Sequence, residues 1–314
     1  MPCHSTIVVM YHYVRPPDAK QWAGLHPLAP REFERQLDYL AGVGEIISPK
    51  QLDEPPRRGR DHILLTFDDG TRDHYEVVFP ILEKRGLTGV FGPISGPALG
   101  EAMPNVHLVH RLTSVCTDEK IWAALRTAFP HFDFGTAEQA ASAYPRDDLL
   151  RARVKFALNF MLEYERAQEF LLAALAARGV TTPGRDWYLT EQQVAEMHAA
   201  GNEFAVHAHR HTPYSGSPDD FCHLDLAPCE LWLTRITGDR PRLYIAPFGG
   251  RGAGDGPLDT LGTVLAARGY RHGFLTTPGN ATAPPRGFWL PRYDAADLPP
   301  RGKPLEQSAP AVVA

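Results

Sequence analysis

Short runs of β-branched and aromatic residues alternate with helix-favouring segments along most of the 314-residue chain. Apolar residues at helical spacing, with Pro near the start and Gly near the end, indicate the helices, and Val-, Ile- and Phe-rich runs indicate the strands. The elements predicted in the first third are strand 5–12, helix 30–44, strand 45–49, strand 62–68, helix 75–86 and strand 87–95. This alternation is typical of a parallel sheet or barrel, so the predicted fold class is α/β.

The alternation stops between about residues 105 and 185, where segments rich in Leu, Ala, Glu and Arg predict helices and no strand. We interpret this part as a helical insertion, which either forms a buried layer without a catalytic role or covers the site as a lid. Alternation then resumes, so residues 1–298 are predicted to form one domain. The tail, residues 299–314, is rich in Pro and Ala and has no periodic apolar face, which predicts disorder.

The composition limits the classes of protein to which the chain can belong. Hydrophobic residues make up 43% and charged residues 22%, as in an ordinary globular enzyme. A net charge of -5 without a block of like charge argues against a nucleic-acid partner. No segment is long and apolar enough for a membrane span, and no signal peptide is apparent, so we expect a cytoplasmic protein with reduced cysteines. The oligomeric state stays open.

Residues able to do chemistry occur at the ends of four predicted strands. They are His12, the pair Asp68 and Asp69 before Gly70, the alternating His207, His209 and His211, and the turn residues Pro247, Phe248 and Gly249. In a parallel α/β barrel the active site lies at the carboxyl ends of the strands. We therefore expect these side chains to meet at one end of a barrel.

Two imidazoles and a carboxylate are a common ligand set for a catalytic divalent metal. His207 and His211 are four residues apart, a spacing that brings two side chains onto one face of a helical turn. His209 alternates with them and would share their face only in an extended segment. The alternative for this segment alone is a surface loop with several histidines. A structural metal site would need four protein ligands, and the sequence offers three.

The paired aspartates are able to divide two tasks. Successive side chains of a strand point in opposite directions unless the backbone turns, and Gly70 permits such a turn. One aspartate can then bind the metal while its neighbour reaches a water on that metal. Because a metal lowers the pKa of its water, the nearby carboxylate can accept the proton.

Three segments together resemble a known family, the polysaccharide deacetylases with a NodB-homology domain (carbohydrate esterase family 4). They are TFDDG at 66–70, the H-x-x-x-H of His207 and His211, and APFGG at 246–250. The resemblance covers nearly the whole chain except the insertion and the tail. It implies a distorted (β/α)7-8 barrel of the NodB-homology type.

The resemblance also implies roles for individual residues. Asp68 would be the catalytic base, and Asp69, His207 and His211 would hold a divalent metal. The family's metal is usually zinc, although cobalt and nickel also suit imidazole and carboxylate ligands. The Phe248 N–H would bind the oxyanion.

Two departures from the family's pattern concern the groups around the catalytic base. Members with the fullest motif set carry an arginine shortly before PFG, which this sequence replaces with LYIAPFG. We predict that Arg292, in LPRYD on the last strand, supplies that charge and contacts Asp68; the alternative is a surface arginine. The family's late histidine, a general acid, is also missing. The candidates are His12, His209 and His272, with His12 first because VVMYHYV resembles branches in which this histidine faces the site.

The sequence therefore predicts a metal-dependent hydrolase that removes an N-acyl group, in the first place acetyl, from an amino sugar or an intermediate containing one. The expected substrates are nucleotide-linked sugars, lipid-linked glycan precursors and N-acylated biosynthetic intermediates rather than wall polymer. An O-deacetylase or a deformylase with the same metal centre is the near alternative. A catalytically inactive, carbohydrate-binding member of the fold is the alternative from another class.

Overall fold

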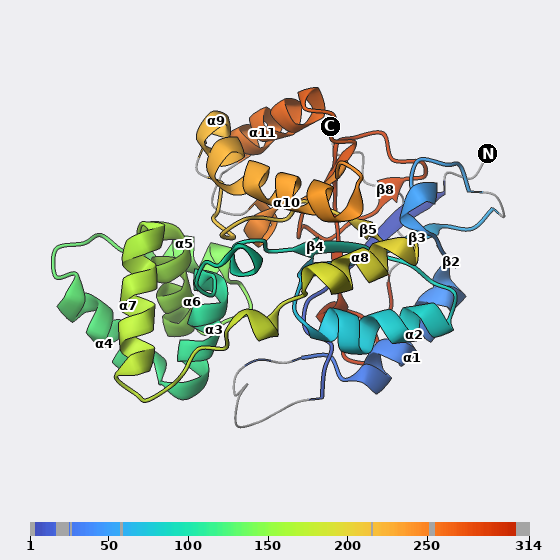
Figure 1. Ribbon diagram of the computed structural model, residues 1–314. Helices are drawn as coiled ribbons and strands as arrows, with labels where there is room; N and C mark the ends of the chain where they lie inside the picture. Colours follow the sequence, from blue (N-terminus) through green and yellow to red (C-terminus); the bar gives the residue numbers. More distant parts are fainter. Residues whose placement is uncertain are drawn as a thin grey trace.

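The computed structural model describes residues 4–16, 25, 27–56, 59–214, 216–250 and 255–305. The predicted fold class is confirmed, because parallel strands form the centre of the molecule and helices surround them (Figure 1). Among the described helices, none combines the length and the apolar character needed to cross a membrane.

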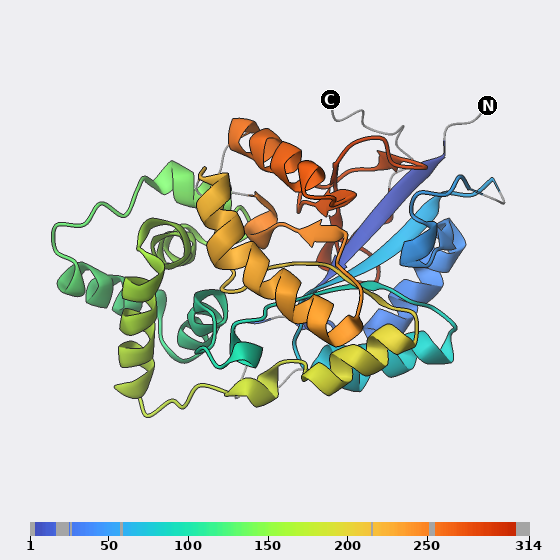
Figure 2. The ribbon, with the colours of Figure 1, turned by 45° about the horizontal axis from the view of Figure 1, so that its top comes forward.

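Two long, adjacent strands form the centre of the main sheet (Figure 2). β1 (Ser5–Tyr11) and β3 (His62–Asp69) pair in parallel, and every residue of both is buried. Burial on both faces explains why these strands are almost continuously hydrophobic in sequence. The other strands of this sheet are β4 (Val90–Pro93) beside β3, β5 (Glu203–Phe204) beside β4, β10 (Tyr293–Asp294) and β8 (Ala281–Thr282) beside β1, and β2 (Glu45–Ile46) beside β3.

A second, three-stranded parallel sheet completes a ring. It contains β6 (Leu243–Ile245), β7 (His272–Phe274) and β9 (Trp289–Leu290). Just beyond β5, Val206 forms a bridge with Tyr244 of β6, and only Pro291 and Arg292 separate β9 from β10. The two sheets are therefore joined by this bridge at one edge and by the short β9–β10 connection at the other, and they share one apolar interior, as in the predicted distorted barrel.

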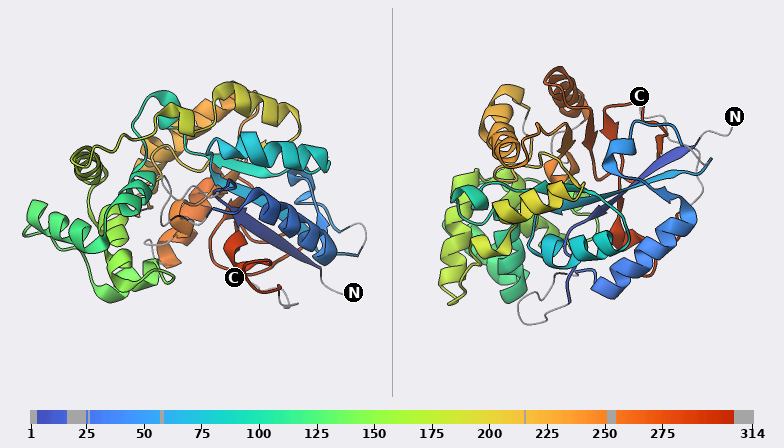
Figure 3. Two further views of the ribbon diagram at one scale, coloured as in Figure 1. Left: turned by 90° about the horizontal axis from the view of Figure 1, so that it is seen from below. Right: turned by 45° about the vertical axis from the view of Figure 1, so that its right-hand side comes forward.

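Helices cover the outside of this ring (Figure 3). They are α1 (Pro30–Val43), α2 (Phe79–Lys84), α8 (Glu191–Ala199), α9 (Pro218–Phe221), α10 (Ala227–Thr237) and α11 (Asp255–Ala267). Between helices and strands lies an aromatic stack, with ring centroids 5.1 Å apart for Tyr11–Phe67 and 4.6 Å apart for Phe67–Phe91. The opposite faces of the strands form a separate apolar cluster, which includes Val8, Leu64 and Ile245 and fills the barrel interior.

Helices also occupy the region after β4, as predicted from its composition. They are α3 (Asn105–Val115), α4 (Asp118–Ala128), α5 (Ala137–Ala143), α6 (Leu149–Phe156) and α7 (Tyr164–Ala176). These helices, here called the helical region, stand to one side of the barrel (Figure 1). They bury an apolar cluster of their own, which includes Leu108, Leu125 and Leu171.

The first residues of the predicted disordered tail lie against α1. Arg301 forms an ion pair with Glu32, and the backbone N–H of Leu305 donates a hydrogen bond to the Tyr39 hydroxyl at 2.8 Å. The remainder of that predicted tail, residues 306–314, lies outside the described residues.

Candidate active site

The end of β3 places two carboxylates at the same end of the barrel. Asp68 shares the inward face of β3 with Leu64, whereas Asp69 would point outward in a regular strand. The backbone turns instead, with a left-handed φ of 74° at Asp69 and 65° at Gly70. A Cβ on Gly70 would lie 2.4 Å from the Cβ of Pro93, so only glycine fits there. The predicted turn is present, but it begins at Asp69 itself.

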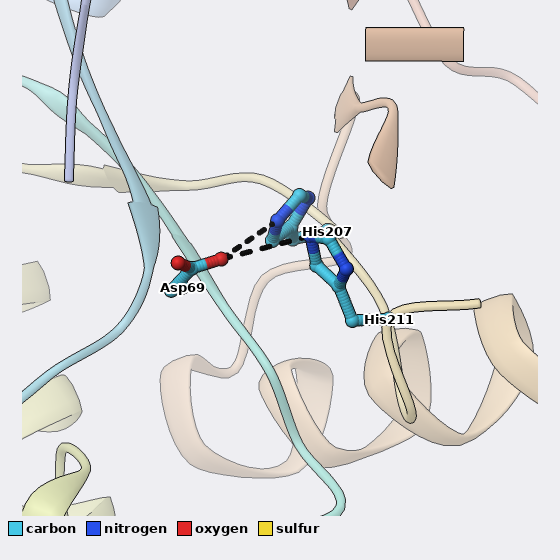
Figure 4. A group of neighbouring side chains, drawn as sticks. All are labelled: Asp69, His207 and His211. Carbon is cyan, nitrogen blue, oxygen red and sulfur yellow. Dashed lines mark hydrogen bonds and ion pairs between the residues drawn. The ribbon is translucent and has the colours of Figure 1, made fainter. Parts of the chain in front are cut away.

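Asp69, His207 and His211 form a compact buried group (Figure 4). Asp69 Oδ1 lies 3.2 Å from His207 Nε2 and 3.7 Å from His211 Nε2. The expectation that a helical turn brings the two histidines together is wrong, because regular strand pairing stops after Phe204 and the chain continues as an irregular loop. His211 itself has a left-handed φ of 59°, and this local turn directs its ring toward His207.

The protonation of these side chains fits a divalent metal. His207 Nδ1–H donates to the Ile245 carbonyl at 2.9 Å, so in the neutral ring Nε2 presents its lone pair to Asp69 Oδ1. Two such acceptors repel each other unless a cation lies between them. Burial lowers the pKa of His211 to about 3, which keeps its ring in the neutral form that binds metals. Burial raises the pKa of Asp69, but its neighbour His107, which donates a hydrogen bond to this carboxylate, outweighs burial and holds that pKa well below its usual range.

Arg292 holds Asp68 through two parallel hydrogen bonds. Its Nη1 and Nη2 lie 2.7 Å from Oδ1 and 2.7 Å from Oδ2 of Asp68, and the side chain is fully buried. The Arg292 guanidinium also donates to the Leu275 carbonyl at 2.8 Å and to Thr66 Oγ1 at 3.1 Å, which fixes its position. The predicted contact between Arg292 and Asp68 is therefore present, because β10 lies beside β1 as barrel closure requires. Burial raises the pKa of Asp68, but the charge and hydrogen bonds of Arg292 outweigh it and lower that pKa.

His12 is the histidine closest to this carboxylate among the three that were considered as general acid. Its Nε2 lies 3.9 Å from Asp68 Oδ2, and 41% of its side chain is exposed. It also lines the cavity described below. His12 therefore faces both the candidate base and the space available to a substrate.

The other two candidates face other groups and do not line this cavity. His209 points away from the metal group, with Nδ1 3.0 Å from Ser95 Oγ and Nε2 3.2 Å from Glu101 Oε1. The ring of His209 therefore points in the direction opposite to those of His207 and His211. His272 begins β7 at the other end of the barrel, where its Nε2 lies 2.7 Å from Asp53.

The PFGG segment forms a tight turn, η7 (Pro247–Gly250), directly after β6. Phe248 and Gly249 both have left-handed backbone conformations, with φ of 54° and 65°. The Phe248 ring packs edge-on against His211, with centroids 4.5 Å apart, and contacts Phe160 of the helical region at 4.7 Å. All three non-glycine residues with positive φ in the described chain belong to this site, and backbone strain of this kind gathers at functional sites.

A further imidazole, which the sequence did not single out, touches the metal group. His107 of α3 is fully buried, and its Nε2 lies 3.1 Å from Asp69 Oδ2. Its Nδ1 lies 2.7 Å from the hydroxyl of Tyr188. The sequence gives little signal for this contact, because the segment carries no distinctive motif and joins Asp69 only through the tertiary fold.

A cavity of about 490 Å³ opens beside His12 and Phe248, between the barrel and the helical region. The barrel contributes Met10, His12, Phe248, Thr276, Pro278, Asp294 and Asp297, and the helical region contributes Ala143, Tyr144, Pro145, Arg146, Asp147, Lys155 and Phe160. Arg146 forms ion pairs with both Asp294 and Asp297, which join the two walls. The helical region therefore covers one side of the site, which agrees with the second of its two interpretations.

Comparison with known proteins agrees with this arrangement. The family model of the polysaccharide deacetylases matches residues 135–271, a range that includes His207, His211 and the PFGG turn. Over these residues the chain is similar to the polysaccharide deacetylases. The two aspartates of this family's TFDDG pattern, Asp68 and Asp69, lie before the matched range, and the fold brings them to the matched histidines. The comparison with curated protein sequences finds no match.

Three solved structures have a similar fold. The deacetylase PplD of Streptococcus pyogenes, in complex with acetate, is 18% identical, with a TM-score of 0.57 over 93% of this chain and 92% of that one. IcaB from Ammonifex degensii is also 18% identical, with a TM-score of 0.55 over 92% and 91% of the two chains. A de-N-acetylase from Aggregatibacter actinomycetemcomitans is 15% identical, with a TM-score of 0.54 over 93% and 95%.

Proposed function

We propose that this protein is a polysaccharide-deacetylase-like, metal-dependent N-deacetylase, which hydrolyses the acetamide of an amino sugar. The observation that carries the proposal is the pairing of an Asp/His/His metal group with a second carboxylate, Asp68, which Arg292 holds in place. Two similar structures support it: one is a deacetylase in complex with acetate and another is a de-N-acetylase.

Asp69, His207 and His211 would hold the metal. When bound, a divalent ion lowers the pKa of a water ligand and polarises the acyl carbonyl. Three protein ligands leave coordination positions open, as catalytic rather than structural sites do. Zinc is the proposed ion, and cobalt or nickel suits the same nitrogen and oxygen donors.

Asp68 accepts the proton of the attacking water in this proposal. Arg292 occupies one lone pair on each of its oxygens, and a carboxylate has about four lone-pair sites, so each oxygen keeps another available. The lowered pKa keeps Asp68 ionised at neutral pH, as a base must be before it takes a proton. The guanidinium thus orients the base and keeps it in its active form.

Arg292→Lys should lower kcat on the order of 100-fold with little change in KM, because one ammonium cannot hold both carboxylate oxygens and small displacements of a catalytic group are costly. Initial rates of acetate release at saturating metal measure this effect. Arg15→Lys is the matched control, because Arg15 also pairs with an aspartate, Asp73, at 2.7 Å. Equal rates in Arg292→Lys and in Arg15→Lys would contradict the orienting role.

Phe248 and His12 would act on two atoms of the tetrahedral intermediate, the oxyanion and the leaving nitrogen. The backbone N–H of Phe248 would donate to the oxyanion that develops on the acyl group. The leaving nitrogen needs a proton before the C–N bond breaks, and His12 lies at the cavity beside Asp68. His12 is therefore the proposed general acid.

His12→Gln should reduce kcat about 100-fold on an N-acetyl substrate but only a few-fold on p-nitrophenyl acetate, whose leaving group needs no proton. The ratio of the two rates separates acid catalysis from general damage to the site. An equal loss on both substrates would contradict the assignment.

The cavity supports a short acylated sugar as the substrate. Its volume of about 490 Å³ lies within the range of small-ligand pockets, and its walls combine the aromatic rings of Tyr144, Phe160 and Phe248 with charged side chains. Such walls suit a sugar ring with an apolar face and several hydroxyls. N-acetylated glycosides, nucleotide sugars and lipid-linked precursors are the proposed classes.

The deciding experiment incubates the zinc-loaded protein with these classes and measures acetate, formate and free amine. The proposal expects acetate and free amine in equal amounts. Acetate without new amine would indicate an O-deacetylase, and formate would indicate a deformylase. Sugar binding without any product would indicate the carbohydrate-binding alternative. The cytoplasmic location stays a prediction.

A further inference from the structure

We propose that His107 is a positioning residue of the metal centre and that Tyr188 in turn fixes the ring of His107. The inference rests on the proposed metal site, because it concerns how the helical region orients the Asp69 ligand. It assigns a task in the reaction to a part of the chain that lies outside the barrel.

The two oxygens of Asp69 face different groups. Oδ1 faces His207 and His211, at 3.2 Å and 3.7 Å, and is the oxygen available to a metal. Oδ2 lies 3.1 Å from His107 Nε2 on the opposite side. His107 thus contacts the carboxylate through the oxygen that the metal group leaves free, and the compact group of possible ligands consists of Asp69 and the other two histidines.

The hydrogen bonds around His107 select one tautomer. A carboxylate only accepts, so Nε2 must carry the proton that is donated to Asp69 Oδ2. Nδ1 is then an acceptor, and the Tyr188 hydroxyl donates to it at 2.7 Å. Burial raises the pKa of Tyr188 well above its usual value, which keeps this hydroxyl protonated. The result is a directed chain of donors from Tyr188 through His107 to Asp69.

Asp69 needs such support because its backbone is strained. Its φ of 74° lies in the left-handed region, which costs on the order of 1–3 kcal/mol for a residue other than glycine. The segment that carries Tyr188 is also tied to this turn by its backbone: Thr71 pairs with Tyr188, and the Leu189 N–H donates to the Gly70 carbonyl at 2.9 Å. Side chain and backbone of the turn are therefore both held from outside the barrel.

Groups that orient a metal ligand typically change metal affinity 10- to 100-fold when they are removed. We expect His107→Ala to raise the zinc Kd by about this factor, measured by competition with a chromophoric chelator. His107→Gln should recover part of the loss, because its amide N–H can donate to Asp69 from a similar position. Tyr188→Phe should give a smaller rise, because the imidazole stays but loses its orienting donor. At saturating zinc the variants should regain most of their kcat.

His110→Gln is the matched control, because His110 lies one turn further along α3 and contacts Tyr13 at 3.2 Å rather than Asp69. Its zinc Kd should equal that of the unchanged protein. An unchanged Kd in His107→Ala would overturn the inference. So would a complete loss of zinc without recovery in His107→Gln, since that result would make His107 a direct ligand. Absence of zinc binding in the unchanged protein would instead overturn the proposed function.

Discussion

His207→Ala should remove both the bound metal and the activity while the fold is retained. His207 supplies one of the three proposed ligand side chains, and an Asp/His pair alone leaves too few protein donors for tight zinc binding. We therefore expect elemental analysis after gel filtration to find no stoichiometric zinc and acetate release to fall to background. Asp69→Ala should give the same result, because it removes the carboxylate that the two histidines face.

Stability gives a second readout that does not depend on turnover. A ligand present at 1,000 times its Kd stabilises the folded state by about 4 kcal/mol. Zinc should therefore raise the melting temperature of the unchanged protein and leave that of His207→Ala unaffected. His62→Ala is the control, because His62 is also buried on a strand but begins β3 at the opposite end. Unchanged zinc content in both ligand variants would contradict the ligand assignment.

The barrel was predictable because its longest strands have a simple pattern. β1 and β3 are hydrophobic throughout, since helices cover one face and the barrel interior covers the other. The apolar and polar residues at 203–211 alternate as in a strand, so the sequence favours a β5 longer than the observed one. Its regular pairing ends at Phe204, since the loop that follows must direct His207 and His211 inward while His209 points away.

The candidate site was predictable to the extent that its residues lie at strand ends. Asp68, Asp69 and the two proposed histidine ligands stand out because carboxylates and imidazoles, a common ligand set for a catalytic metal, lie where predicted strands end. Arg292 followed from topology, since the last strand of a closed barrel lies beside the first. No comparable rule predicts the contact of His107 with Asp69, because the path of α3 relative to the barrel depends on packing among many side chains.

Asp68→Asn should keep the metal but lose most of the turnover, with kcat falling by about 10²–10⁴-fold. The amide is nearly the same size as the carboxylate, so the metal group on the neighbouring residue is preserved. It cannot accept a proton from water as a base, however. It also presents an NH₂ group to the Arg292 guanidinium, which has only donors, so one of the two 2.7 Å hydrogen bonds is lost.

The test measures zinc content and kcat on the same preparation. Loss of a catalytic base and loss of a metal ligand both lower kcat, but only loss of a ligand also lowers the zinc content. Asp73→Asn is the matched control: Asp73 is also buried and paired with an arginine, but it accepts from the Val14 N–H at 2.6 Å and lies outside the proposed machinery. The folded Asp73→Asn protein should have a normal kcat. This result would show that the loss of kcat in Asp68→Asn does not come from breaking a buried ion pair. Near-normal kcat in zinc-loaded Asp68→Asn would contradict the proposed base, and loss of zinc in that variant would move Asp68 into the ligand set.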